Sequence, residues 1–344
     1  MQLRKLGWTD LNITTIGLGT WAIGGSGWLF GWGHQNDEDS IATIHQALDV
    51  GINWIDTAAG YGLGHSEMVV GEAIKGLSDK PIIATKCSRV WDKEGNLSGS
   101  LKKESIQSEC EASLKRLKIE VIDLFQIHWP LPDEDIEEGW NAVANLVKEG
   151  KIRYGGVSNF SVEQLKRIQP IHPVASLQPP YSMLKRGIEN QILDYCSRND
   201  IGVIVYSPMQ KGLLTGKMTR ERIQNLPADD HRSKDPLFKD PVISNILDLV
   251  EDLRPIAENN NKTLAQLAIA WTLAHPIVTA AIVGARTTSQ IKETVNAGDW
   301  ILSKENLETI GEILGKYPPL PDIQPVRQQE KRRRLLKSNK KALF

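Results

Sequence analysis

The chain is patterned as short, β-branched apolar runs that alternate with helical periodicities along most of its 344 residues. Apolar residues predominate in these runs and do not alternate regularly with polar ones, which is typical of strands covered on both faces of a parallel sheet. Eight such runs are found, at Thr15–Gly19, Ile52–Asp56, Pro81–Lys86, Val121–Ile127, Ile152–Val157, Val174–Gln178, Gly202–Tyr206 and Val278–Val283. The pattern therefore predicts an α/β protein with a parallel sheet.

Helical patterns fill the intervals between the runs. Ile41, Ile44 and Leu48 mark the apolar face of one helix, and Gly51 follows it as a C-terminal cap would. Ser161 has the position of an N-cap for another helix. Eight strands alternating with helices predict a single (β/α)8 TIM barrel, with an N-terminal β-hairpin. A doubly wound sheet is the alternative, but no GxGxxG motif follows the first strand.

The regular alternation is interrupted twice. About 70 residues separate the seventh run from the eighth, which is more than between the other runs. They contain the polar stretch Leu226–Phe238 and two further helical patterns, which predicts an enlarged loop after strand seven on the catalytic face and an extra helix. Prolines and a basic tail follow a last helix near Lys304–Gly315. We expect a barrel domain over residues 1–317 and a basic C-terminal extension over 318–344.

Composition excludes several classes of protein. Lysine and arginine number 41 and aspartate and glutamate 42, a balance that argues against a nucleic-acid partner bound through a general basic field. No apolar stretch approaches the ~20 residues that a membrane-spanning helix needs, and no secretory signal is visible. Cys87, Cys110 and Cys196 form no CxxC pair, and no Cys/His cluster has zinc spacing. We expect a cytoplasmic protein with no metal and no membrane partner, either monomeric or homo-oligomeric.

Polar residues mark the ends of three consecutive runs, where a (β/α)8 barrel assembles its active site. Asp56 ends the second run, with Tyr61 shortly after it in a glycine-rich loop, Lys86 ends the third, and His128 follows the fourth. A buried lysine needs a counter-ion, which Asp56 can supply. A tyrosine beside that lysine would have its phenol pKa lowered and so serve as a proton donor. His128 could orient a substrate oxygen.

Each of these four residues also has a plainer explanation. Lysine and aspartate at strand ends are usually solvated, a single histidine is more often a packing residue, and a tyrosine between glycines often anchors a turn. Four such residues at consecutive strand ends favour a catalytic site.

These residues carry a family likeness. Asp56-Thr57-Ala58 with Tyr61, Ala84-Thr85-Lys86 and Gln126-Ile127-His128 closely resemble the Asp–Tyr–Lys–His tetrad of the aldo-keto reductase superfamily. The likeness extends over about Leu3 to Leu314. The segment Gly212–Lys217 is most similar to bacterial and plant members related to the inositol-operon oxidoreductases and to potassium-channel β subunits.

The resemblance implies a role for each residue of the tetrad. Tyr61 would be the general acid, and Lys86 would lower its pKa. Asp56 would pair with Lys86, and His128 would orient the substrate.

The resemblance also implies a nicotinamide cofactor. Ser158, Asn159 and Gln178 would meet the carboxamide, with Tyr206 stacked on the ring. The pyrophosphate and the adenosine end would lie against Ser207, Leu213, Gly216, Lys217, Gly284, Arg286, Gln290 and Glu293. Arg286 would face a 2′-phosphate, for which its planar fork of donors is suited. This favours NADPH over NADH.

Tryptophans gather where the substrate pocket is expected. Five of the ten follow the first, third and fourth strands, namely Trp21, Trp28, Trp32, Trp91 and Trp129. They predict an aromatic wall for an aldehyde or ketone with a flat or apolar part, although they could equally pack beneath loops. The leading hypothesis is an NADPH-dependent carbonyl reductase. The alternative is a cofactor-sensing regulatory or partner-binding subunit resembling channel β subunits.

Overall fold

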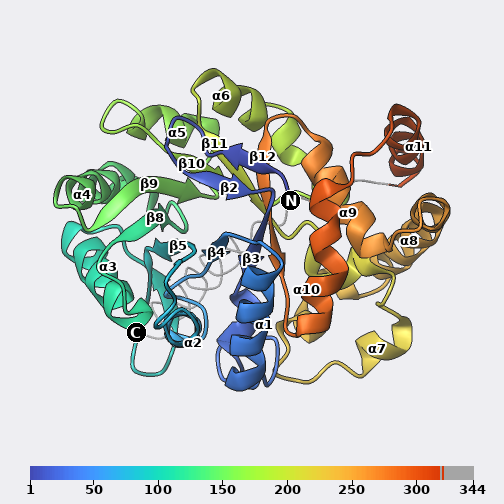
Figure 1. Cartoon of the computed structure of the whole chain (residues 1–344), viewed down its shortest axis with the longest axis horizontal. Coiled ribbons are helices and arrows are strands. Elements are labelled where there is room, and N and C mark those ends of the chain that lie inside the picture. Colours follow the sequence, from blue (N-terminus) through green and yellow to red (C-terminus); the bar gives the residue numbers. More distant parts are fainter. Residues whose placement is uncertain (318–319, 321–344) are drawn as a thin grey trace, which may run out of the picture.

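The computed structural model describes residues 1–317 and residue 320. Its centre is a closed barrel of eight parallel strands in the order β3-β4-β5-β8-β9-β10-β11-β12, with β12 pairing back onto β3 (Figure 1). These strands are β3 (Ile16–Gly19), β4 (Trp54–Asp56), β5 (Ile82–Cys87), β8 (Ile122–Ile127), β9 (Ile152–Ser158), β10 (Ser176–Gln178), β11 (Gly202–Tyr206) and β12 (Val278–Gly284). The predicted (β/α)8 barrel is confirmed.

Helices surround the barrel, and those predicted around Ile41–Leu48, after Ser161 and near Lys304–Gly315 are present. They are α1 (Asp37–Asp49), α2 (His65–Ala73), α3 (Lys103–Leu117), α4 (Ile136–Lys148), α5 (Val162–Ile168), α6 (Ile192–Arg198), α7 (Arg220–Gln224), α8 (Val242–Asn259), α9 (Leu264–Ala274), α10 (Thr288–Thr294) and α11 (Lys304–Gly315). Ser161 caps α5 in a capping box with Gln164, and Gly51 follows α1 with a φ of 89°. Within the described residues, no helix is both long and apolar enough to cross a membrane.

The predicted N-terminal hairpin pairs β1 (Leu3–Lys5) with β2 (Asn12–Thr14) in antiparallel fashion. Its apolar residues Leu6, Leu11 and Ile13 are fully buried and belong to the same cluster as Trp54 and other inward-facing strand side chains. Trp54 Nε1 donates to the carbonyl oxygen of Thr14 at 2.9 Å. The hairpin therefore packs on the barrel interior.

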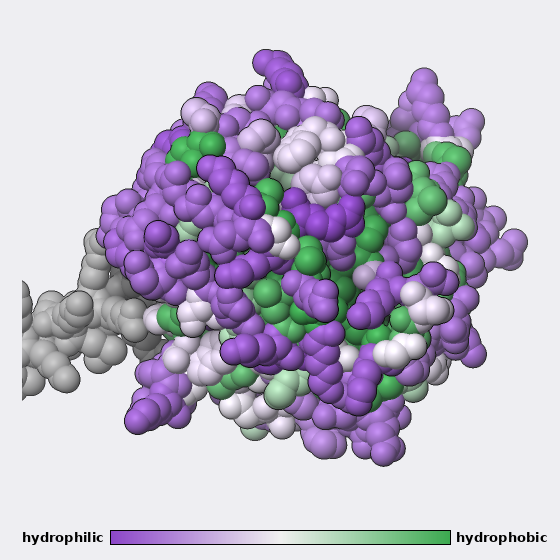
Figure 2. Space-filling view, turned by 60° about the vertical axis from the view of Figure 1, so that its left-hand side comes forward, coloured by the Kyte–Doolittle hydropathy of each residue, from purple (hydrophilic) through white to green (hydrophobic). Residues whose placement is uncertain are grey.

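The long connection between β11 and β12 contains α7, α8 and short 3₁₀ turns before α9, as the predicted enlarged loop and extra helix require. Helix α8 packs between α9 and α11 at one side of the barrel (Figure 1), around a hydrophobic cluster of its own. Apart from residue 320, the predicted basic extension over 318–344 lies outside the described residues. In the face shown in Figure 2, hydrophobic side chains gather in a recess within a mostly hydrophilic surface.

Candidate active site

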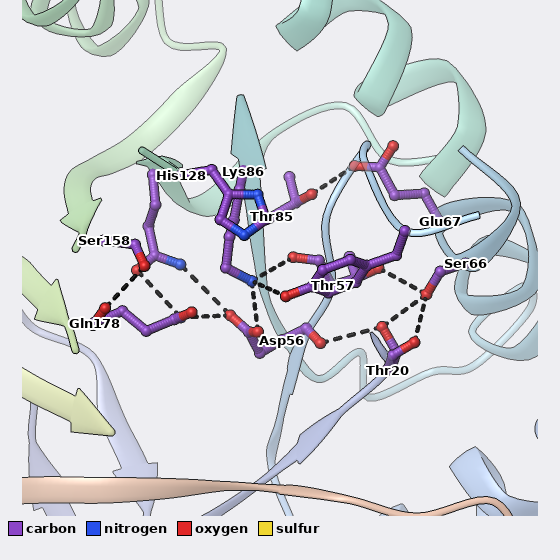
Figure 3. Close-up of polar contacts among 12 residues, drawn as sticks. Thr20, Asp56, Thr57, Ser66, Glu67, Thr85, Lys86, His128, Ser158 and Gln178 are labelled. Carbon is purple, nitrogen blue, oxygen red and sulfur yellow. Dashed lines mark hydrogen bonds and ion pairs between the residues drawn. The ribbon is translucent and has the colours of Figure 1, made fainter. Parts of the chain in front are cut away.

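The four predicted catalytic side chains meet at the carboxyl ends of β4, β5 and β8. Lys86 Nζ donates to Asp56 Oδ1 at 2.6 Å and to the carbonyl oxygen of Thr57 at 2.9 Å (Figure 3). The same nitrogen lies 3.3 Å from Tyr61 Oη. The His128 ring stands nearly perpendicular to the Tyr61 ring, with centroids 5.7 Å apart. The structure thus brings Asp56, Tyr61, Lys86 and His128 into one cluster.

Asp56 and Lys86 form a buried ion pair, since both residues are at most 2% exposed. The second carboxylate oxygen of Asp56 is also occupied, because Gln178 Nε2 donates to Oδ2 at 2.8 Å and Gln126 Nε2 lies 3.5 Å away (Figure 3). Buried charges are tolerated where a partner and hydrogen bonds satisfy them, which is the case on both sides of this pair.

A tight turn presents Tyr61 to the pair. Gly62 adopts a φ of 61°, and a Cβ atom at this position would lie 2.1 Å from the carbonyl oxygen of Gly24. Only glycine fits so close an approach of two backbones. The turn that carries Tyr61 is therefore packed directly against the loop that follows β3.

The charge states in the cluster differ in one respect from the sequence prediction. Burial, followed by the charge of Asp56, raises the pKa of Tyr61 well above its usual value, so the predicted lowering is wrong for the protein alone. The desolvation of a phenolate outweighs the nearby ammonium. A phenol with this pKa keeps its proton at neutral pH and remains a hydrogen-bond donor.

His128 and Lys86 are shifted in the other direction. Burial lowers the pKa of His128 well below its usual value, and the charges of Lys86 and Arg89 lower it further. Burial also lowers the pKa of Lys86, while the carboxylate of Asp56 opposes this lowering. His128 is therefore a neutral imidazole near pH 7, suited to hydrogen bonding with an uncharged oxygen.

The residues predicted to meet the nicotinamide carboxamide form a connected polar cluster beside the tetrad. Ser158 Oγ donates to the carbonyl oxygen of Gln178 at 2.8 Å, and Asn159 Nδ2 donates to that of His128 at 3.0 Å. Tyr206 Oη donates to Asn159 Oδ1 at 2.8 Å. These residues end β9, β10 and β11 or follow directly, so strand register brings them together.

The residues predicted for the pyrophosphate and adenosine end come from the loops after β11 and β12. Lys217 pairs with Glu293 at 2.5 Å, and Gln290 Oε1 accepts from the main-chain N–H of Arg286 at 2.7 Å. Leu213 has a fully buried side chain, which leaves only its main chain for a ligand contact. Ser207 and Gly216 adopt positive φ values in the first loop, and Gly284 is the exposed end of β12.

Arg286 has partners that the sequence did not indicate. Its Nε donates to Gln35 Oε1 at 2.7 Å and its Nη1 to the carbonyl oxygen of Trp32 at 3.0 Å, while Nη2 donates to the carbonyl oxygen of His34. The guanidinium therefore holds the loop after β3. Three of its five N–H groups are directed to these acceptors.

Of the five predicted pocket tryptophans, two lie against Tyr61. Trp21 stacks on the Tyr61 ring and Trp28 is tilted against it, each with centroids 6.4 Å apart. Trp32 joins this aromatic group by packing edge-on against Trp21, with ring centroids 5.3 Å apart. Trp91 lies on the hairpin β6 (Arg89–Trp91) and β7 (Leu97–Gly99), and no ring contact joins it or Trp129 to Tyr61 in the described part of the chain.

The enlarged loop after β11 closes over these aromatic residues. His231 stacks on Trp21 with centroids 5.0 Å apart, and both its main-chain N–H and its Nδ1 bind the carbonyl oxygen of Gly31. Because that oxygen is an acceptor, Nδ1 carries the imidazole proton. Arg232 pairs with the buried Asp230 at 2.6 Å and lies over the Trp32 ring. Two loops distant in sequence thus form one wall.

Sequence reasoning missed a second polar group behind the tetrad. Ser66 Oγ contacts the hydroxyls of Thr20 and Thr57, and Glu67 accepts from Thr85 (Figure 3). Ser66 and Glu67 are fully buried in the first turn of α2, beside Val69 and Val70. Polar residues on the apolar side of a short helix were the available signal. Among the described residues, no group of three or more His, Cys, Asp or Glu side chains could hold a metal ion.

Comparisons with known proteins agree with this geometry. The model of the Aldo/keto reductase family matches residues 15–314. The chain is 40% identical to the aldo-keto reductase YhdN of Bacillus subtilis, over 91% of this chain and 94% of that protein. It is 36% identical to the NADH-specific methylglyoxal reductase of Escherichia coli, over 86% and 93% of the two chains.

A solved structure is similar over most of its length. The glycerol dehydrogenase of Gluconobacter oxydans superimposes with a TM-score of 0.84 at 37% identity, covering 94% of this chain and 98% of that one. The chain therefore belongs to the Aldo/keto reductase family and is an NAD(P)H-dependent oxidoreductase.

Proposed function

We propose that this protein is an NADPH-dependent carbonyl reductase, in which a hydride is transferred to an aldehyde or ketone and Tyr61 is the general acid. The observation that carries the proposal is the position of Lys86 Nζ, 2.6 Å from Asp56 Oδ1 and 3.3 Å from Tyr61 Oη. A protonated phenol beside a buried ammonium can release its proton to a developing alkoxide, because the ammonium stabilises the phenolate that remains.

The residues at the strand ends fit a nicotinamide cofactor. Gln178 Nε2 is directed to Asp56, and Gln178 Oε1 accepts no hydrogen bond from the described residues, so it can accept one from an amide. Ser158 and Asn159 lie beside it with hydroxyl and amide groups. The two N–H groups of Arg286 that the loop does not use can meet a phosphate. Bound reduced nicotinamide supplies the hydride.

The chain's own residues then have separable tasks. His128, as a neutral imidazole, orients the substrate oxygen by a hydrogen bond. Tyr61 Oη holds the proton that this oxygen receives. Lys86 stabilises the phenolate, and Asp56 keeps Lys86 charged. Trp21 and Trp28 flank the Tyr61 ring and exclude water from that side.

The substrate class follows from this wall and from the relatives. The E. coli protein is named a methylglyoxal reductase and the G. oxydans protein a glycerol dehydrogenase, which supports small oxygenated carbonyl compounds or the corresponding alcohols as substrates here. Aromatic rings beside the general acid also accommodate flat aldehydes. We propose cytoplasmic action on small molecules, without a nucleic-acid or membrane partner.

Consumption of NADPH tests the reaction. We expect oxidation with 4-nitrobenzaldehyde and with methylglyoxal, and a fall in kcat of about 10²–10⁴-fold in Tyr61→Phe, since the general acid is removed. Tyr195→Phe on α6 is the matched control and keeps full activity. Quenching of tryptophan fluorescence on NADPH addition shows that both variants still bind. Wild-type protein that binds NADPH but reduces no carbonyl in a broad panel would overturn the proposal and favour the regulatory alternative.

Cofactor choice has its own test. Arg286 favours NADPH, whereas one relative is named as NADH-specific. Fluorescence titrations with the two cofactors are expected to give tighter binding of NADPH, and Arg286→Ala to remove that preference. Equal affinity in the wild type contradicts the NADPH assignment and leaves the reaction itself untouched.

A further inference from the structure

A second carboxylate lies behind the Asp56–Lys86 pair. Glu67 is fully buried, and Thr85 Oγ1 donates to its Oε1 at 2.5 Å (Figure 3). Its other oxygen, Oε2, accepts from both Nε and Nη2 of Arg116, each at 2.7 Å. Each of these partners donates, so Glu67 acts only as an acceptor and is bound as a carboxylate.

The three residues join the elements that carry the catalytic pair. Thr85 precedes Lys86 on β5, and Glu67 lies in the first turn of α2, directly after the Tyr61 turn. Arg116 comes from α3, and its side chain runs beneath the end of that turn, where a Cβ atom on Gly64 would lie 3.0 Å from Arg116 Cδ. Glu67 is therefore linked through Thr85 to the strand of Lys86, and through the first turn of α2 to the segment that carries Tyr61.

We propose that Glu67 is a positioning residue for the reaction, whose buried carboxylate keeps Lys86 charged and holds the strand of Lys86 against the Tyr61 turn. The inference rests on the proposed function, for which it adds a residue that does not touch the substrate. Two cations, Lys86 and Arg116, are balanced by two carboxylates, Asp56 and Glu67. Without the Glu67 charge, Lys86 would lose one of the two carboxylates whose charge favours its ammonium form, so that form would be less favoured.

The direction of the shifts at Lys86 agrees with this role. Burial lowers the pKa of Lys86, and the charge of Glu67 acts with that of Asp56 to oppose the lowering. If the Glu67–Arg116 ion pair only held α2 against α3, removing either partner would have the same effect on Lys86. If Glu67 acts on Lys86 through its charge, the effect depends on whether the carboxylate or the guanidinium is removed.

Two variants separate these roles. Glu67→Gln removes the negative charge and leaves Arg116, whereas Arg116→Gln breaks the same ion pair and leaves the carboxylate. Both lose the tie between α2 and α3. They differ in the charge that remains, because Glu67→Gln leaves the guanidinium of Arg116 and Arg116→Gln leaves the carboxylate of Glu67. Glu67→Asp keeps the carboxylate as a conservative control.

The readout is the titration of Lys86 itself, followed by NMR of protein with lysine isotope-labelled at Cε and assigned with Lys86→Met. We expect Glu67→Gln to lower the Lys86 pKa by on the order of 1 unit, Glu67→Asp to stay near the wild type, and Arg116→Gln to leave it unchanged or raise it. Equal Lys86 titration in Glu67→Gln and the wild type, or a fall of the same size in both unpaired variants, overturns the proposal.

Turnover gives the second readout. In Glu67→Gln the alkaline limb of the kcat profile for carbonyl reduction is expected at lower pH, with KM changed less than threefold. If Glu67→Gln does not fold, Arg116→Gln carries the test, and a lowered Lys86 pKa in that variant overturns the proposal. Wild-type protein without turnover would refute the proposed function alone, because the Lys86 titration needs no substrate.

Discussion

Arg286 and Gln35 hold each other through reciprocal hydrogen bonds: Arg286 Nε donates to Gln35 Oε1 at 2.7 Å, and Gln35 Nε2 donates to the carbonyl oxygen of Arg286 at 3.0 Å. Arg286, which is proposed to face the adenosine phosphate, therefore also holds in place the loop that carries Trp21 and Trp28. One side chain connects the two ends of the site.

Replacing either partner is expected to loosen that loop. Arg286→Ala and Gln35→Ala both remove hydrogen bonds to residues 32–35, so amide hydrogen exchange in this segment should rise in both. Only Arg286→Ala removes a cation, so only that variant should lose the preference for NADPH. Slow exchange of the segment in Arg286→Ala would show that the loop is held by its other contacts, such as His231 with Gly31.

The buried pair of Asp56 and Lys86 makes a prediction on stability. Asp56→Asn leaves a buried ammonium without its counter-ion, which costs about 3–5 kcal/mol of unfolding free energy. Adding Lys86→Met removes the unpaired charge, so the double variant should be more stable than Asp56→Asn while remaining inactive. Chemical denaturation measures both. A double variant no more stable than Asp56→Asn would show that the hydrogen bonds from Gln178 and Gln126 matter more than the charge.

The fold could be predicted because its signals are local and repeated. Apolar runs such as Gly202–Tyr206 and caps such as Ser161 can be recognised directly in the sequence, and the closed barrel follows from the number and order of the runs. The tetrad could be predicted because a barrel gathers its strand ends at one face. Position along a strand was enough to place Asp56, Lys86 and His128.

Other features depend on contacts between distant segments, which have no local signal. The hydrogen bonds between Arg286 and Gln35 join residues far apart in sequence, as does the stacking of His231 on Trp21. The pKa of Tyr61 was predicted in the wrong direction because the sequence shows a neighbouring lysine but not the depth of burial. Proximity could be inferred from the sequence, whereas desolvation could not.

The aromatic wall is expected to control substrate preference. Trp21→Ala removes the ring stacked on Tyr61, so KM for 4-nitrobenzaldehyde should rise about tenfold, with a smaller effect on methylglyoxal, which buries less apolar surface. Trp8→Ala, in the N-terminal hairpin where the ring packs on Tyr154, is the matched control. Steady-state kinetics with both substrates measure the difference. Equal effects of the two substitutions would place the aromatic part of the substrate elsewhere.

His231 makes the protein sensitive to acid. Burial, followed by the charge of Lys211, lowers its pKa from 6.5 to about 4, although Asp230, Asp235 and the Gly31 carbonyl act in the opposite direction. As the pH falls from about 6.5 towards 4, the unfolded chain takes up a proton at this residue that the folded protein does not, so the free energy of unfolding decreases. Above pH 6.5 both states are neutral there, and the residue contributes no pH dependence.

His231→Gln should therefore reduce the loss of stability between pH 7 and pH 5 by about 2 kcal/mol, since one group that titrates differently in the two states is removed. Denaturant unfolding at the two pH values measures this, and His34→Gln, at an exposed position, is the control. The variant loses the ring stacked on Trp21, so its stability at pH 7 also falls; the prediction concerns only the difference between the two pH values. An unchanged difference would mean that His231 becomes protonated in the folded protein without cost, which its partly buried position against Trp21 and the charge of Lys211 argue against.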